Sequence, residues 1–415
     1  MLKCLFLLML PVTFLASCSS ESNEIRSFYR DGTTITDSVH LRLVERELPR
    51  IMKANHLDAE GIRIYTSLLP NMNDSIDKLV RRLGDSVYSH INWDEKAPEQ
   101  AFVDSLKKTG RPLLNAGIVL IDNSTGQIIC NYSSWQGKKG DAVSLVRRLG
   151  GLGRTFLFAL AMQEEYRPED RYPQLQSGEG YSPIHEGGLD RTFYNAIAQQ
   201  SGGGSPYGLG QRYSQKQVEI FLDQLQLDAE DIYNHPAFLD LSVSLTAVTK
   251  TYTAFYNGGI LHVPTVIDSI TDAKGKVLYR NQIISKRILN KETSHEMIRL
   301  LDYYAHEGIG RVVEQRYEGS PDFIGNFAKP AGVGPAGYFI AITKKYTVGI
   351  FSAFALRDLR VRSVTFNQPH GMTVPIWLEV MRVLEPKRNQ NEDRRVMEQT
   401  YPVFPERKET PEIAL

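Results

Sequence analysis

The sequence is poor in cysteine and shows no excess of charge of either sign. The 415 residues include three cysteines, Cys4, Cys18 and Cys130. Lys and Arg together number 48, as do Asp and Glu, so the formal net charge is zero. Without a long basic run there is no electrostatic footprint for binding nucleic acid, and we expect no nucleic-acid partner.

The motifs of metal and nucleotide sites are also missing. His295-Glu296 and His185-Glu186 lack the second histidine of a His-Glu-x-x-His zinc motif, and no pair of cysteines is available. Gly332-Val-Gly334 is not followed by Lys-Ser or Lys-Thr, so it does not make a phosphate-binding loop. We therefore expect no metal site and no cofactor.

The N-terminus has the pattern of an export signal. Lys3 is followed by an apolar stretch, 5–15, that is too short to span a bilayer, and then by Leu15-Ala-Ser-Cys18. This tetrapeptide resembles a bacterial lipobox, which implies cleavage before Cys18 and lipidation of its thiol. We expect a periplasmic lipoprotein anchored at the outer membrane through the lipid on Cys18. An ordinary secretory signal that happens to end in a cysteine is the alternative.

Cys130 is then the only thiol of the mature chain, so no internal disulfide can form. It alternates with Ile128 and Tyr132 in a strand pattern. This pattern predicts a small buried residue rather than a reactive thiol.

Apolar spacing predicts the elements of the body. The composition, 42% hydrophobic and 23% charged, is that of a chain with a folded core. The spacing is helical over 38–55, 75–92, 155–165 and 238–259. Strands are expected over 61–70, in an alternating hairpin over 116–130, over 265–279, and in two apolar runs over 339–354. A last helix is expected over 375–382, with Trp377 in the core.

Two of these segments resemble penicillin-binding proteins of class A. Gly61 to Pro70 is similar to the strand that joins the glycosyltransferase and transpeptidase domains in that family, although Leu69 replaces an aspartate and no glycosyltransferase domain precedes it. The helix containing Thr246-Ala-Val-Thr-Lys-Thr-Tyr-Thr-Ala-Phe-Tyr-Asn-Gly-Gly259 and the hairpin after it match the family over the longest stretch. The resemblance implies an α/β fold of the α+β type, with an antiparallel sheet sandwiched between helices and a small N-terminal linker domain.

The first catalytic motif of that family falls on Arg147 to Phe156. The motif Ser-x-x-Lys supplies an acyl nucleophile and its base, and here Gly151 takes the place of the serine and Arg154 that of the lysine. Gly151 has no hydroxyl to acylate. Arg154 stays protonated and cannot accept a proton. The alternative is that Gly150, Gly151 and Gly153 only make a flexible turn before a core helix.

The other two motifs are degenerate as well. The second, Ser-x-Asn, falls on Gln200 and Gly202, or on Ser201 if the alignment shifts by one, and neither register keeps the asparagine. The third, Lys-Thr-Gly or Lys-Ser-Gly on an edge strand, falls on the segment Lys329-Pro330-Ala331. Pro330 removes a backbone donor from that edge. Lys329 is able to attract a carboxylate, but a lone edge lysine is more often a guard against aggregation.

Two strings match catalytic motifs in the wrong place. Ser75-x-x-Lys78 and Ser105-x-x-Lys108, which overlaps Lys108-Thr-Gly110, both precede the first strand of the transpeptidase-like region. Their order along the chain excludes them as the family's motifs. The expected organisation is a signal peptide over 1–17, a tether over 18–36, a linker region over 37–112, a transpeptidase-like domain over 113–385 and a charged, disordered tail over 386–415.

We predict a catalytically inactive lipoprotein of penicillin-binding-protein type, not an enzyme, that acts as scaffold or regulator in assembly of the cell envelope. Its expected partners are the membrane, through the lipid on Cys18, and peptidoglycan or cell-wall synthesis proteins. Two alternatives stay open. One is an active D,D-transpeptidase or carboxypeptidase with a displaced nucleophile, Ser201 or Thr155, and the other is a structural lipoprotein whose cleft is closed by the loop over 167–190.

Overall fold

The structure of the protein is a computed structural model. It describes residues 25–58, 60–70, 72–90, 97–137, 140–164, 166–171, 192–199, 207–227, 241–316, 320–328, 336–354, 368 and 370–385. The expected signal peptide, Cys18 and the segment 386–415 that was expected to be a disordered tail therefore lie outside the described residues. Within these residues, no helix is both long and apolar enough to cross a membrane.

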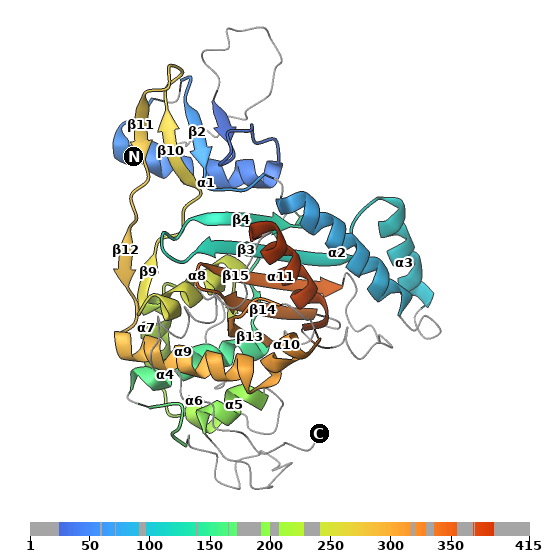
Figure 1. Cartoon of the computed structure of the whole chain (residues 1–415), viewed down its shortest axis with the longest axis vertical. Helices are drawn as coiled ribbons and strands as arrows, with labels where there is room; N and C mark the ends of the chain where they lie inside the picture. Colours follow the sequence, from blue (N-terminus) through green and yellow to red (C-terminus); the bar gives the residue numbers. More distant parts are fainter. Residues whose placement is uncertain are drawn as a thin grey trace, which may run out of the picture.

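A five-stranded antiparallel sheet forms the centre of the molecule (Figure 1). Its strand order is β13-β14-β15-β3-β4, and every neighbouring pair is antiparallel. All residues of β13, β14 and β15 are buried, which explains why these strands read as continuous apolar runs rather than as alternating ones. The strands are β3 (Leu114–Asp122), β4 (Ile128–Ser133), β13 (Ile324–Ala328), β14 (Ala336–Ile342) and β15 (Tyr346–Phe354).

Helices cover both faces of this sheet. On one face lies α8 (Leu245–Tyr256), so close to β15 that a Cβ on Gly349 would clash with the Thr249 hydroxyl. On the other face lies α11 (His370–Leu384), whose fully buried Trp377 packs its ring 5.5 Å from that of Phe339. Next to α11 lies α2 (Met72–Ser89). The predicted α+β fold with an antiparallel sheet between helices is therefore confirmed.

The remaining elements surround this core. Below it in Figure 1 lie the helices that lead to the candidate site. The helices are α1 (Ser38–Asn55), α3 (Ala97–Lys108), η2 (Gly150–Leu152), α4 (Gly153–Gln163), α5 (Phe193–Gln199), α6 (Tyr207–Gly210), α7 (Gln215–Gln224), α9 (Lys291–His306), η4 (Ile309–Arg311) and α10 (Val312–Arg316). The short strands are β5 (Gln136–Gly137), β6 (Gly140–Asp141), β7 (Arg147–Arg148), β8 (Ser242–Val243), β9 (Ile260–His262) and β12 (Ser285–Arg287).

A second sheet, at the N-terminal end, is assembled from distant parts of the chain. Its order is β1-β2-β10-β11, and the strands are β1 (Arg26–Phe28), β2 (Arg63–Thr66), β10 (Ile267–Thr271) and β11 (Val277–Arg280). The hairpin β10–β11 thus leaves the region 113–385 to complete the linker sheet (Figure 1). Strand β1 lies within the segment 18–36 that was expected to be a tether, and it pairs in parallel with β2. The folded part therefore includes residues that the polar composition of this segment did not predict.

Most predicted elements are present with shifted ends. The helix expected over 238–259 begins at Leu245, because Ser244 caps it and residues 242–243 pair with β7 as strand β8. The helix expected over 75–92 begins earlier, at Met72. The interior apolar residues Leu245, Val248, Tyr252 and Phe255 are all buried, as their spacing predicted. Cys130 is also buried, and burial raises the pKa of its thiol to about 12, so the thiol is protonated.

A buried histidine joins α1 to the central sheet. His40 Nδ1 lies 3.1 Å from the Tyr29 hydroxyl, and His40 Nε2 lies 3.1 Å from the carbonyl oxygen of Asn131 in β4. The amide of Asn73 in α2 also lies 3.1 Å from Nε2. Burial lowers the pKa of His40 below 6.5, although Asp37 acts in the opposite direction. The neutral ring therefore holds three elements together.

We expect this joint to make the fold sensitive to acid. Above pH 6.5 His40 is neutral in both the folded and the unfolded chain. As the pH falls from 6.5 toward the lower pKa of the folded state, the unfolded chain gains the proton but the folded chain does not. The unfolded state is thereby favoured, and the free energy of unfolding decreases. Urea unfolding should show that the free energy of unfolding falls less on acidification for His40→Gln than for wild type. The fall is measured for each protein from its own value above pH 6.5, because the variant starts from a lower stability. His56→Asn, at an exposed position, is the control. Equal slopes for wild type and His40→Gln would contradict the assignment.

Candidate functional site

The turn that carries Gly151 begins in a left-handed glycine. Gly150 has φ +58°, a conformation that favours glycine, and the chain then passes through η2 into α4. The amide of Leu149 donates to the carbonyl of Leu241 at 2.8 Å, which anchors the turn beside β8. Gly150 and Gly151 therefore lie in a defined 3₁₀ turn and Gly153 begins α4, and Gly150 is the one of the three whose backbone conformation favours glycine.

Gly151 lies beside the end of the edge strand β13. A Cβ built on Gly151 would lie 3.6 Å from the Cβ of Ala328, which is ordinary van der Waals contact. Ala328 is the last residue of β13 and directly precedes Lys329. The first motif position is thus brought to the strand end from which the third motif continues, although Lys329, Pro330 and Ala331 themselves lie outside the described residues. Among the residues that the structure describes, none packs so closely on Gly151 that a side chain would be excluded there.

Arg154 stands in the first turn of α4. It is three residues beyond Gly151, so the two positions lie on the same side of the helix start. Its side chain is half-buried, between the fully buried Gly153 and Thr155. A guanidinium here supplies fixed positive charge but no base.

Below these positions a buried hydrogen-bond network ties three elements together. The Tyr252 hydroxyl of α8 donates to Asn326 Oδ1 of β13 at 2.8 Å, and Asn326 Nδ2 donates to the Thr155 hydroxyl of α4 at 3.1 Å. Each of the three residues is at most 1% exposed. Burial raises the pKa of Tyr252, so its hydroxyl remains a donor. Asn326 was not predicted; a lone amide within the apolar run of β13 was its only signal.

This network also bears on the alternative nucleophile. Thr155 is 1% exposed and its oxygen already accepts from Asn326. A substrate carbonyl has no access to a hydroxyl in that position, so the structure offers no support for Thr155 as nucleophile. The other alternative, Ser201, lies outside the described residues together with Gln200 and Gly202.

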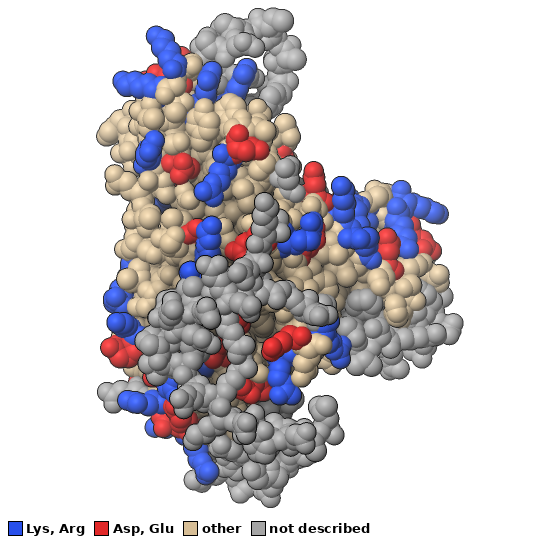
Figure 2. Space-filling view, in the orientation of Figure 1, with Lys and Arg blue, Asp and Glu red and all other residues tan. Residues whose placement is uncertain are grey.

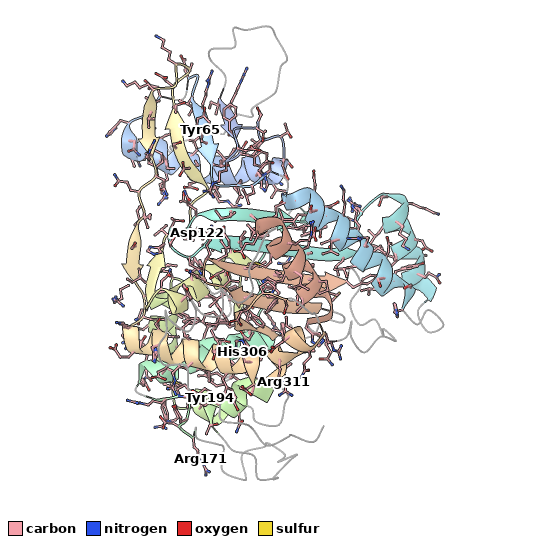
Figure 3. All side chains as sticks on the ribbon, in the orientation of Figure 1. Tyr65, Asp122, Arg171, Tyr194, His306 and Arg311 are labelled. Carbon is pink, nitrogen blue, oxygen red and sulfur yellow. The ribbon has the colours of Figure 1, made fainter. Side chains whose placement is uncertain are left out.

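Helix α5, which leads to the second motif, packs between α4 and α9. Phe193 meets Phe158 of α4 edge-on with ring centres 5.4 Å apart, and the rings of Tyr194 and Tyr303 lie 4.5 Å apart. Figure 3 shows Tyr194 at this lower end of the molecule. The described part of the second motif region therefore lies against the helix that begins with the first motif.

Helix α9 carries the strongest electrostatic interactions near this region. His306 Nε2 lies 2.8 Å from Asp322 Oδ1 and its Nδ1 lies 3.0 Å from Asp302 Oδ1 (His306 is labelled in Figure 3). Burial alone would lower its pKa, but the two carboxylates outweigh this and raise it to about 10. About two turns before His306 in the same helix, Arg299 pairs with Glu169 and Glu296. The i, i+4 spacing of Asp302 and His306 was a signal in the sequence that was not used.

The two strings that match catalytic motifs lie elsewhere. Ser75 and Lys78 are in α2, which packs with α11 on the face of the sheet opposite to α8 and α4. Ser105 and Lys108 are in α3. In the described part of the chain, no group of three or more His, Cys, Asp and Glu side chains is arranged to hold a metal ion.

Comparison with known proteins relates the fold to one class. No family model matches the sequence. The chain is 21% identical over 260 residues to penicillin-binding protein 1B of Haemophilus influenzae, which is 58% of this chain and 33% of that protein. The chain therefore spans about a third of the length of this relative.

Solved structures extend the likeness to nearly the whole folded part. Penicillin-binding protein PonA1 of Mycobacterium tuberculosis matches with a TM-score of 0.63 and 14% identity, over 85% of this chain and 92% of that one. Penicillin-binding protein 3 of the same organism matches with 0.61 and 14%, over 88% and 96%. The D,D-transpeptidase domain of a peptidoglycan glycosyltransferase from Eggerthella lenta matches with 0.59 and 13%, over 88% and 99%. The chain has the fold of a penicillin-binding protein transpeptidase domain, which confirms the resemblance at the level of fold.

The buried network can be tested by mutation. Asn326→Ala should lower the free energy of unfolding by about 2–3 kcal/mol, because it removes one hydrogen-bond partner from each of two buried hydroxyls. Tyr252→Phe should cost about 1 kcal/mol, and Thr155→Ser, which keeps the hydroxyl, less than that. Urea unfolding of the Asn326→Ala/Tyr252→Phe double variant should show a loss smaller than the sum of the two. Simple additivity would show that the three side chains do not act as one network.

Proposed function

We propose that this chain is a catalytically inactive lipoprotein of penicillin-binding-protein type that acts as a scaffold or regulator in peptidoglycan assembly. The observation that carries the proposal is Gly151. It stands at the turn into α4, beside the end of β13, where the fold family has its serine, and it has no atom able to form an acyl-enzyme.

The loss of the base supports the same proposal. Arg154 lies on the same side of the helix start as Gly151 and cannot accept a proton at any accessible pH. A nucleophile moved to another position would also need a new base. Within α4, Thr155 is the one residue with a hydroxyl side chain, and this hydroxyl is buried and accepts a hydrogen bond from Asn326 of β13.

The core around α4 is well packed, whereas the positions of the nucleophile and the base carry Gly151 and Arg154. This combination favours a role in binding rather than in catalysis. The α4 residues that pack inward, among them Phe156 and Leu157, are fully buried, and Phe156 meets Tyr252 edge-on with ring centres 6.0 Å apart. A core of this quality holds the surface around the former site in a single arrangement. Such a surface is suited to bind a cell-wall synthesis enzyme or peptidoglycan without turning it over.

The first test is reaction with penicillin. The chain from residue 18 onward, incubated with a fluorescent penicillin and weighed by mass spectrometry, should carry no covalent adduct while an active transpeptidase beside it is labelled. Gly151→Ser should also stay unlabelled, although the serine fits sterically, because Arg154 provides no base. Ser75→Ala and Ser105→Ala are controls for labelling outside the site. An adduct on the wild-type chain, mapped to Ser201 and abolished by Ser201→Ala, would overturn the proposal.

The second test concerns partners. Cross-linking in cells that produce the tagged full chain, followed by purification, should recover a cell-wall synthesis protein or peptidoglycan fragments. A tagged, unrelated lipoprotein exported by the same signal sequence is the control for proximity alone. Recovery of no envelope protein and no glycan beyond this control would count against a role in assembly.

A further inference from the structure

The N-terminal sheet has one covered and one open face. The residues that face α1 include Ile64 and Ile270, both fully buried. On the opposite face, strand register places Phe28 of β1 beside Tyr65 of β2, then Ser269 of β10 and Arg280 of β11. Among the described elements, α1 is the helix that packs on this sheet. We call the second surface the open face.

The open face combines positive charge with aromatic rings. Arg63 and Arg280 are exposed, and Arg26, on the same face, is partly exposed. Between them the rings of Phe28 and Tyr65 stack with centres 5.2 Å apart and planes 20° apart. Figure 2 shows Lys and Arg atoms gathered at this end of the molecule, and Figure 3 shows Tyr65 on the sheet.

Two carboxylates near the ends of these strands, Asp31 and Asp272, accept hydrogen bonds within their own turns. Asp31 accepts hydrogen bonds from the amide and hydroxyl of Thr33, and Asp272 accepts from the amides of Lys274 and Lys276. Both lysines are exposed at the tip of the β10–β11 hairpin and add to the positive charge. The exposed side chains of Arg63, Arg280, Lys274 and Lys276 outnumber these two carboxylates, so they bring an excess of positive charge to this sheet although the whole chain is neutral.

Two exposed apolar side chains border the same sheet. Ile25, directly before β1, is 46% exposed, and Val277 of β11 is 48% exposed. Arginine, tyrosine and isolated aliphatic side chains together suit the boundary between water and lipid headgroups. Two copies of the open face would repel each other through their arginines, so the face does not suit self-association.

The distance along the chain to the expected lipid limits where the membrane can be. Cys18 precedes Arg26 by eight residues. Even fully extended, this segment spans at most about 29 Å. A lipid on Cys18 would therefore keep the N-terminal sheet, rather than the end of the molecule with α4 and α5, next to the bilayer.

We propose that the open face of the N-terminal sheet binds the surface of a membrane containing anionic phospholipids, and so orients the candidate site away from the bilayer. The charge and aromatic residues of the open face carry the proposal by themselves. Its biological setting rests on the proposed lipidation of Cys18. The phosphates of the headgroups would pair with Arg63 and Arg280, while Phe28 and Tyr65 lie at the level of the headgroups.

The experiment uses a chain from residue 18 onward with Cys18→Ala, so that no lipid contributes to binding. It is sedimented with phosphatidylcholine vesicles, and with vesicles of phosphatidylcholine and phosphatidylglycerol in a two-to-one mixture. We expect binding to the second kind only, weakened by added salt. Arg63→Glu/Arg280→Glu should weaken it at least about tenfold. The control Lys216→Glu/Lys291→Glu makes the same change of charge at exposed positions of α7 and α9, and should bind as the wild type does.

Several outcomes would overturn the proposal. They are equal binding to both kinds of vesicle, equal weakening by the control variant, and binding to polyglutamate as strong as to the anionic vesicles. Melting temperatures of both variants show whether a loss of binding reflects unfolding. Lipidation is measured separately, by incorporation of labelled palmitate into the full chain and into its Cys18→Ala variant. A failure of the lipoprotein proposal is thereby distinguished from a failure of the membrane-binding face.

Discussion

The hydrogen-bonded chain of Tyr252, Asn326 and Thr155 is the constraint on which the arrangement of the candidate site depends. It joins the central helix α8, the edge strand β13 and the first turns of α4 inside the core. Because all three groups are buried, each bond broken would leave a polar atom without water or partner. The positions of Gly151 and of the end of β13 are therefore fixed relative to each other by residues that take no part in acyl transfer. The framework around α4 and β13 is therefore held by contacts that do not involve the side chains at positions 151 and 154.

Much of the fold was readable from the sequence, and the parts that were not have physical reasons. The helix at Leu245 and the β3–β4 hairpin were found because burial imposes a period on apolar residues. Strand β1 was missed because its segment is short and polar, and it is held by pairing with β2 rather than by its own pattern. The membership of the β10–β11 hairpin in the N-terminal sheet depends on long-range pairing, which periodicity does not encode.

In the candidate site, too, some residues were predicted from the sequence and others were not. Chain order and residue chemistry led to the prediction that Gly151 and Arg154 occupy the positions of the first motif. The structure shows Gly151 beside Ala328 at the end of β13. Asn326 and the pair of carboxylates around His306 were not foreseen, because their importance arises from partners distant in the sequence or from burial. The pKa and the hydrogen-bond partners of a side chain depend on the residues that surround it in the folded chain, and these are not evident from its neighbours in the sequence.

The pairing of β2 with β10 has a consequence for how the chain reaches its native state. The Ser67 hydroxyl contacts the carbonyl of Val266, 199 positions later, and the glycine-capped end of α8 precedes the returning hairpin. The N-terminal sheet therefore cannot form completely until about two thirds of the chain is available. Until then, the edge of β2 that pairs with β10 has no partner. If the chain were exported from its N-terminus, each molecule would pass through a state in which β1 and β2 have emerged but β10 and β11 have not. The first hundred residues cannot complete their sheet without the later strands. Until those strands are available, chaperones that bind unfolded chains would protect the early strands from aggregation.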